Sequence, residues 1–393
     1  MTEARPDIEI TPYEVAVPEA SLADLRDRLA RTRWPERETV DDWSQGIPLD
    51  YVRDLCAYWG SGYDWRPCEV ALNGWGSHRA RLDGGGPEPL WIHFLHIPSK
   101  HPDATPLVLT HGWPGSVLEF RKVIGALSDP EAHGGDPADA FHVVCPTLPG
   151  YGFSEKPTRS GWGVERIAAA WAQLMAGLGY DRYGAQGGDW GSAVTTAIGQ
   201  QDTEHCIGIH LNMAVARPEP GDMADLTEAE KGALGALTHY DQWDSGYSKQ
   251  QSTRPQTVGY GLVDSPAAQA AWIVEKFWSW MDCDGHPENV LTRDELLDNV
   301  MMYWLPGAGA SSGRLYWESF RSVRDGAVTL PVGISVFPKE IFRVSRRWAE
   351  RRFSDLRFFN EPQIGGHFAA FERPEQFVED VTAFFRTVRN PAG

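Results

Sequence analysis

The chain has 393 residues, of which 42% are hydrophobic and 23% charged, and its formal net charge is −18. Its length predicts roughly two to three domains of ~150 residues each. The acidic balance argues against nucleic acid and anionic membranes as partners, because phosphate binding needs clustered Lys and Arg.

Neither a membrane span nor an export signal is expected. No apolar run approaches the ~20 residues that cross a bilayer, and the polar N-terminus lacks the layout of a signal peptide. Five widely spaced cysteines without a Cys-x-x-Cys pair predict a reduced, cytoplasmic protein with no structural zinc.

Residues 1–105 are expected to form a separate N-terminal segment that wraps the rest of the chain. Leucines recur at helical spacing over Leu22–Leu29, with Ser21 as the expected N-cap. A second helix is expected over residues 48–59. The apolar run Leu90–Ile97 is predicted to begin the sheet, and the segment carries no candidate for chemistry.

Residues 106–212 alternate between short apolar strands and helices. Strands are expected at Leu107–Thr110, at Phe141–Cys145, near Ala185 and at Cys206–Leu211, and a helix over residues 164–178. This alternation is typical of a mostly parallel sheet with helices on both faces.

Residues 213–324 break that rhythm. They are helical in pattern and rich in Trp and Tyr, so we expect a cap over the strand ends, where ligands bind in open α/β folds. Residues 325–393 resume the core pattern. They are predicted to hold strands at Val332–Phe337 and Leu356–Phe359 and a closing helix at Pro374–Arg386.

The pentapeptide Gly187–Gly191 places a carboxylate, Asp189, at the centre of a sharp strand-to-helix turn. Glycines two residues before and after the centre are what such a strained turn requires. An aspartate that attacks a saturated carbon forms an alkyl ester, so this position predicts displacement at that carbon and then ester hydrolysis. The alternative is a Gly-rich turn whose Asp caps the next helix.

Two further side chains complete a catalytic order along the chain. Glu340 follows a strand and His367 lies on a loop after the last strand, so the order is nucleophile, acid and base, as in the α/β-hydrolase fold. A His367 oriented by Glu340 can take a proton from water that attacks the ester. The main-chain N–H groups of Trp113 and Trp190 are expected to bind the oxyanion of the tetrahedral intermediate that forms when water attacks the ester. Each of these two residues also has a non-catalytic alternative. Glu340 could begin a surface helix, and His367 could be a loop histidine that is hydrogen-bonded to the backbone.

Three motifs together resemble the microsomal-type epoxide hydrolases. They are His-Gly-Trp-Pro-Gly-Ser at 111–116, Gly-Gly-Asp-Trp-Gly-Ser at 187–192 and Gly-Gly-His-Phe at 365–368. The N-terminal segment is also similar to that family's N-terminal domain, so the resemblance covers nearly the whole chain. It implies the α/β-hydrolase fold, no cofactor, no metal, and conversion of an epoxide to a vicinal diol.

The resemblance also implies two cap tyrosines that hydrogen-bond the epoxide oxygen. By motif context these are Tyr247 and Tyr316, with Tyr303 as the rival for the second. A phenol stays protonated at neutral pH and can donate to the alkoxide that forms, although core packing is the alternative role for each tyrosine. Tyr303, Trp304 and Phe368 are expected to line the substrate pocket.

The expected partners are a small-molecule epoxide and water. The Trp-rich cap favours an apolar, aryl or bulky epoxide, and the resemblance extends to relatives in natural-product pathways such as enediyne biosynthesis. Two alternative functions stay open: a haloalkane dehalogenase that uses the same aspartate, and a non-catalytic binding protein of this fold. A homodimer also stays open. A serine esterase is disfavoured, because the turn carries no Gly-x-Ser-x-Gly.

Overall fold

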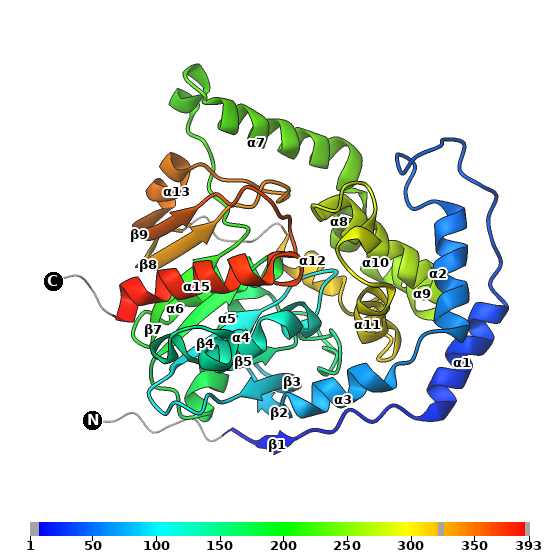
Figure 1. Ribbon diagram of the computed structural model, residues 1–393, viewed down its shortest axis with the longest axis horizontal. Helices are drawn as coiled ribbons and strands as arrows, with labels where there is room; N and C mark the ends of the chain where they lie inside the picture. Colours follow the sequence, from blue (N-terminus) through cyan, green and yellow to red (C-terminus); the bar gives the residue numbers. More distant parts are fainter. Residues whose placement is uncertain (1–7, 321–325, 390–393) are drawn as a thin grey trace.

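The computed structural model describes residues 8–320 and 326–389, and one sheet of nine strands forms its centre (Figure 1). The strands are β1 (Ile10–Pro12), β2 (Ser77–Leu82), β3 (Leu90–Ile97), β4 (Thr105–Thr110), β5 (Phe141–Pro146), β6 (Tyr183–Gly187), β7 (Cys206–Leu211), β8 (Val328–Ser335) and β9 (Phe353–Asn360). Their order across the sheet is β1-β2-β3-β5-β4-β6-β7-β8-β9. Strands β4 to β9 are parallel, and β1, β2 and β3 add an antiparallel edge, so the predicted mostly parallel sheet is confirmed.

Helices cover both faces of this sheet. The core helices are α4 (Ile124–Ser128), α5 (Val164–Gly177), α6 (Trp190–Gln201), α13 (Arg346–Arg352), α14 (Ala369–Glu372) and α15 (Pro374–Arg389). A Cβ added at Gly208 of β7 would lie 3.1 Å from Phe384 of α15, and a Cβ added at Gly199 of α6 would lie 3.2 Å from Ile209 of β7. Because neighbouring strand residues point to opposite faces, α15 and α6 lie on opposite sides of the sheet.

A helical insertion separates β7 from β8. Its helices are α7 (Glu228–His239), α8 (Gly246–Thr253), α9 (Pro255–Asp264), α10 (Pro266–Trp280), α11 (Arg293–Trp304) and α12 (Arg314–Ser319). In Figure 1 most of them lie beside the sheet, and α7 reaches across to them from the side of α13. Across the described ranges, no helix combines the length and the apolar character that crossing a bilayer requires.

The N-terminal segment contacts both the sheet and the insertion. Its helices are α1 (Glu19–Ala30), α2 (Leu49–Ser61) and α3 (Arg66–Gly74). Helices α1 and α2 pack against α10, and the hydroxyl of Tyr63 donates to Asp298 of α11 over 2.7 Å. Figure 1 shows α1 and α2 flanking the insertion on the side away from the sheet.

Three details of this segment differ from the sequence prediction. Helix α1 begins at Glu19 with Pro18 as its N-cap, and Ser21 lies inside the first turn, where its N–H donates to the Pro18 carbonyl over 2.9 Å. Proline suits this start because its φ is already near the helical value. Strands β1 and β2 and helix α3 were not predicted. The strands are short and lack a clear apolar pattern. They form because β2 pairs with β3 and β1 pairs in turn with β2.

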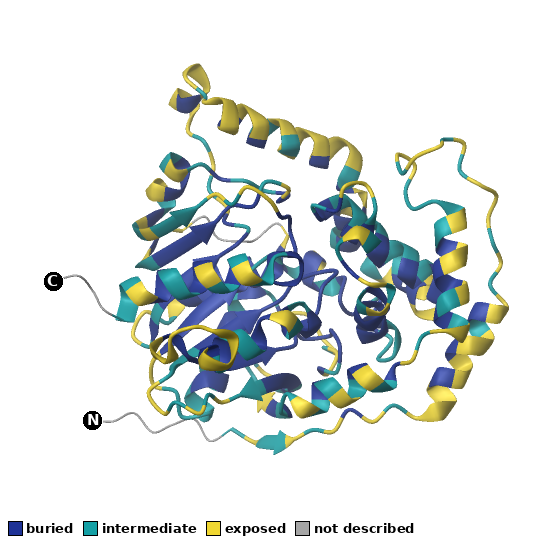
Figure 2. Cartoon of the chain, viewed as in Figure 1, coloured by how far each residue is buried: buried dark blue, intermediate teal, exposed yellow. Residues whose placement is uncertain are grey.

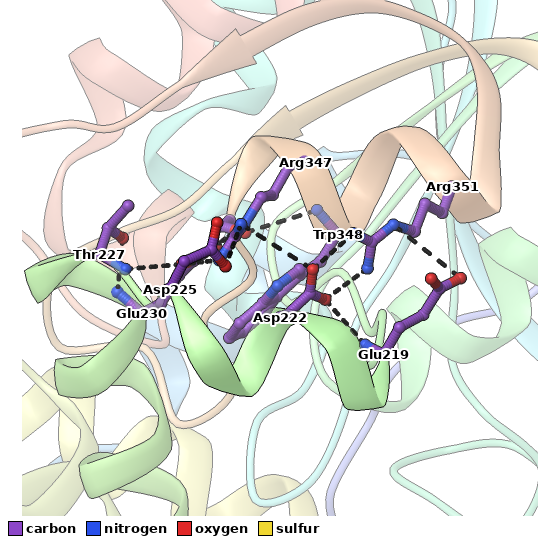
Figure 3. Close-up of polar contacts among 9 residues, drawn as sticks. Glu219, Asp222, Asp225, Thr227, Glu230, Arg347, Trp348 and Arg351 are labelled. Atoms are coloured by element: carbon purple, nitrogen blue, oxygen red, sulfur yellow. Dashed lines mark hydrogen bonds and ion pairs between the residues drawn. The ribbon is translucent and has the colours of Figure 1, made fainter.

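Helix α7 is largely exposed (Figure 2), yet ion pairs hold its first turn and the preceding helix η4 (Pro220–Ala224) on α13 (Figure 3). Both Nε and Nη2 of Arg347 lie 2.6 Å from the Glu230 carboxylate. Arg351 Nη2 lies 2.6 Å from Asp222 Oδ1. Both carboxylates are buried, so the link between core and insertion depends on two bidentate arginines.

Candidate active site

The turn between β6 and α6 holds Asp189 in an unusual backbone conformation, with φ 51° and ψ −129°. A Cβ added at Gly187 would lie 2.1 Å from the Gly191 carbonyl oxygen, and one added at Gly191 would lie 1.9 Å from the Thr110 carbonyl oxygen. Both positions therefore require glycine. The crowding explains how a residue with positive φ is kept at the tip of the turn.

The side chain of Asp189 makes no capping hydrogen bond to α6, so the helix-cap interpretation is wrong. Its Oδ1 accepts a hydrogen bond from the main-chain N–H of Trp113 over 2.8 Å. Its Oδ2 lies 3.4 Å from Nε2 of His367. One carboxylate oxygen is thus held by a backbone donor, while the other faces an imidazole.

The imidazole of His367 is held from its far side by a carboxylate. Its Nδ1 lies 2.6 Å from Glu340 Oε1, and each of the two side chains is 2% exposed, so the surface interpretation of Glu340 is wrong. A backbone bridge between Lys339 and Gly366 joins the two loops that carry them. Burial lowers the pKa of His367, but the charges and hydrogen bonds of Glu340 and Asp189 outweigh it and raise the pKa well above its ordinary value.

Two tyrosines from the insertion line the same cavity as Asp189. This cavity has a volume of about 300 Å³. The ring of Tyr247 in α8 stacks on Trp113, with centroids 4.7 Å and planes 8° apart. Tyr316 in α12 meets the ring of Trp190 edge-on at 4.8 Å. Burial raises the pKa of both phenols well above the ordinary value, so both hydroxyls stay protonated and can donate hydrogen bonds.

Sequence reasoning missed Tyr240, which also lines the cavity. Its hydroxyl lies 3.0 Å from the hydroxyl of Tyr247. Tyr240 begins a π-helical turn (Tyr240–Asp244) that ends before α8 starts at Gly246, so no regular helical spacing in the sequence linked it to Tyr247. Met213, Phe320 and Phe342 add apolar walls, and no pattern in the sequence connected them to the site.

The structure places Tyr303, Trp304 and Phe368 outside the residues that line this cavity, contrary to expectation. The Tyr303 hydroxyl donates to the Gly115 carbonyl over 2.7 Å and so braces the loop at 111–116. Trp304 packs beside the N-terminal helices, and Phe368 stacks within the core. Their apolar character is used for packing between elements, which sequence alone does not distinguish from a pocket wall.

Within the described residues, one group has the spacing to hold a metal ion: His101, Asp129 and Glu131. The Nζ of Lys100 lies 2.9 Å from each of its two carboxylates. These residues do not line the cavity at Asp189. The Lys100 ammonium group already forms an ion pair with each of the two carboxylates.

Two family models match the chain. A model described as the epoxide hydrolase N terminus matches residues 10–120, and one for the alpha/beta hydrolase fold matches residues 105–244. The second match includes the turn at Asp189.

Individual proteins are similar over nearly the full length. A protein of Stigmatella aurantiaca, provisionally named an epoxide hydrolase, is 53% identical over 381 residues, which are 97% of this chain and 86% of that protein. Epoxide hydrolase 1 of Sus scrofa is 33% identical over 97% of this chain and 89% of its own. The crystal structure of juvenile hormone epoxide hydrolase from Bombyx mori superposes with a TM-score of 0.88 at 30% identity, covering 98% of this chain and 95% of that one.

Proposed function

The chain belongs to the epoxide hydrolase family, and from that premise we propose a two-step mechanism at Asp189. In the first step its carboxylate attacks an epoxide carbon, and in the second step water activated by His367 hydrolyses the ester. The observation that carries this proposal is the unequal setting of the two carboxylate oxygens. Oδ1 accepts the 2.8 Å bond from Trp113, and Oδ2 remains beside the cavity and the imidazole.

In the first step Oδ2 bonds to the epoxide carbon and the strained C–O bond breaks. The released oxygen develops negative charge and takes a proton from Tyr247 or Tyr316, which line the cavity with Asp189. The phenol that gives its proton regains one from solvent. Tyr240 supports this role because its hydroxyl, 3.0 Å from that of Tyr247, orients the donor.

In the second step water bonds to the carboxyl carbon of Asp189 and gives a proton to Nε2 of His367. Negative charge then develops on Oδ1, which faces the N–H of Trp113, and we assign the N–H of Trp190 as the second donor. Collapse breaks the ester C–O bond, and the diol oxygen takes the proton from His367. The Asp189 carboxylic acid that is left releases the second water proton to solvent, which replaces the one taken up by the tyrosine. The carboxylate is restored, and the sum is epoxide plus water to vicinal diol.

Ester formation also prepares the base. In the free enzyme the Asp189 carboxylate helps to raise the pKa of His367. An ester has no negative charge, so that contribution disappears once the alkyl-enzyme forms. The pKa of His367 then falls, and the neutral imidazole that accepts a proton from water becomes more populated.

The substrate we propose is an apolar epoxide with an aryl or other bulky group. The walls formed by Met213, Phe320 and Phe342 favour an apolar substituent, and the volume of about 300 Å³ sets the upper limit on its size. A role in natural-product biosynthesis stays a prediction.

The test is trapping of the covalent intermediate with styrene oxide. His367→Gln should form one adduct with the mass of the epoxide on the intact protein and turn over only once, because the ester forms without a base to hydrolyse it. Asp189→Ala should form none. No adduct on His367→Gln, or turnover by Asp189→Ala, would contradict the proposal.

A haloalkane dehalogenase would use the same aspartate but needs N–H donors for the halide. The indole N–H of Trp280, whose ring lies 5.1 Å from that of His367, is committed to Asp244 over 2.6 Å. Chloride release from 1-chlorobutane at rates comparable to styrene oxide turnover would favour this alternative. The family assignment favours an enzyme over a non-catalytic binding protein.

A further inference from the structure

Three donors from the C-terminal end of helix α10 converge on one carboxylate, that of Asp244. Its Oδ2 accepts the indole N–H of Trp280 over 2.6 Å and the hydroxyl of Ser279 over 3.2 Å. Its Oδ1 accepts a hydrogen bond from the ammonium group of Lys276. The side chains of Asp244 and Lys276 are only 12% and 7% exposed. A carboxylate that accepts hydrogen bonds on both oxygens at a nearly buried position holds its partners in a fixed geometry.

Asp244 belongs to the segment that carries two of the cavity tyrosines. It ends the π-helical turn that begins at Tyr240, and Tyr247 follows it by three residues, in α8. The hydroxyls of these two tyrosines lie 3.0 Å apart. The ring of Trp280 also packs on that of Tyr247, with centroids 5.1 Å apart. The bonds between Asp244 and α10 therefore fix the backbone that presents Tyr247 to the cavity.

The same end of α10 supports the loop that carries the histidine. The main-chain N–H of His367 donates to the Trp280 carbonyl over 3.0 Å. The N–H of Gly365 donates to the Asp282 carboxylate over 2.9 Å. A Cβ added at Gly366 would lie 2.4 Å from the Trp280 carbonyl oxygen, so the loop rests directly on this residue. The rings of Trp280 and His367 also meet edge-on, with centroids 5.1 Å apart.

We propose that Asp244 is a positioning residue for both steps of the reaction and acts through Trp280. Its hydrogen bond to the indole fixes the orientation of a ring that packs against both Tyr247 and His367. This inference rests on the two-step mechanism proposed above. Neither Asp244 nor Trp280 is among the described residues that line the cavity of Asp189, so both act on the tyrosine and the histidine rather than on the epoxide.

The pattern of donors around Asp244 requires a carboxylate. In Asp244→Asn one oxygen is replaced by an NH2 group, which is itself a donor. The charged ammonium group of Lys276 attracts the amide oxygen more strongly, so the NH2 group is left facing the indole N–H of Trp280. Two donors repel each other, and the indole must turn away. A displacement of about 1 Å outside the reacting groups can slow a reaction about 100-fold.

The experiment measures both steps in the full-length protein with styrene oxide as probe. Rapid mixing over a range of epoxide concentrations gives the saturating alkylation rate, the half-saturating concentration and the hydrolysis rate, and intact-protein mass gives the number of active sites. For Asp244→Asn we expect both rates per active site to fall about 10- to 100-fold. The half-saturating concentration should change by less than about threefold, because the residues that bind the epoxide are kept. A loss of folded protein alone would lower the number of active sites and leave both rates unchanged.

A second variant tests the same hydrogen bond from its other side. Trp280→Phe keeps an aromatic ring and the ion pair between Asp244 and Lys276, but it removes the indole N–H. It should slow both steps as Asp244→Asn does, and it keeps the test decisive if Asp244→Asn folds poorly. The double variant should be little slower than either single variant, because both changes remove the same hydrogen bond.

Asp241→Asn is the matched control. Asp241 lies on the same turn and its carboxylate pairs with Lys249 over 3.2 Å, but its side chain is 73% exposed. Both rates should stay within about twofold of wild type, because an exposed ion pair contributes little.

Two results would overturn the inference: wild-type rates per active site in both Asp244→Asn and Trp280→Phe, or losses that add fully in the double variant. Failure of His367→Gln to form any adduct would instead overturn the two-step mechanism.

Discussion

Replacing Gly112 with alanine tests whether Asp189 must keep its observed position. A Cβ at residue 112 would lie 2.1 Å from Asp189 Oδ1 and 2.3 Å from its Cβ, whereas favourable contacts between such atoms are about 3.5 Å or longer. The carboxylate must therefore move by more than about 1 Å, which breaks its 2.8 Å bond to the Trp113 N–H. A misplacement of about 1 Å can cost ~100-fold in rate. We expect alkylation by styrene oxide to slow by at least that factor.

The assay is the single-turnover alkylation rate, followed by tryptophan fluorescence and by intact-protein mass. Gly188→Ala is the matched control on the other side of the nucleophile, because a Cβ there meets nothing nearer than 3.6 Å, at Asn212. It should retain the wild-type rate within about threefold, since only ordinary van der Waals contact is added. If Gly112→Ala folds like wild type and alkylates at the wild-type rate, the assigned position of the nucleophile is wrong.

Three further outcomes are expected. Tyr316→Phe should slow alkylation about 10- to 100-fold, because it removes a hydrogen-bond donor to a charged oxygen. Tyr303→Phe removes only the hydrogen bond to the Gly115 carbonyl and should have a smaller effect. The reverse order of the two single-turnover rates would exchange the roles of these tyrosines. Ester hydrolysis should slow as the pH falls, because the carboxylate of Glu340 raises the pKa of His367 and only the neutral imidazole accepts a proton. A single-turnover rate of hydrolysis that does not vary with pH would contradict this expectation. Arg347→Ala should lower the midpoint of urea unfolding at pH ~7. The hydrogen bonds of Arg347 hold the pKa of Glu230 at about 2 in the folded protein. Their contribution to the free energy of unfolding is therefore fully present above the ordinary Glu pKa and should be lost as the pH falls through the pKa of the folded protein.

The sequence alone was enough to predict those features that depend on residues close together along the chain. The spacing of Gly187 and Gly191 around Asp189 predicts the nucleophile, because a strained strand-to-helix turn excludes other side chains at these positions. Chain order then predicted Glu340 and His367, which the structure brings within 2.6 Å of each other. The apolar runs also predicted most core strands, because strands buried on both faces read as continuous hydrophobic segments.

Tertiary structure decided the features that depend on which elements pack together. Tyr316 and Tyr303 lie in similar aromatic helices, and only the packing of α12 and α11 turns the first to the cavity and the second to Gly115. A side chain's chemistry can be read from sequence, but the partner it meets depends on contacts between residues far apart along the chain.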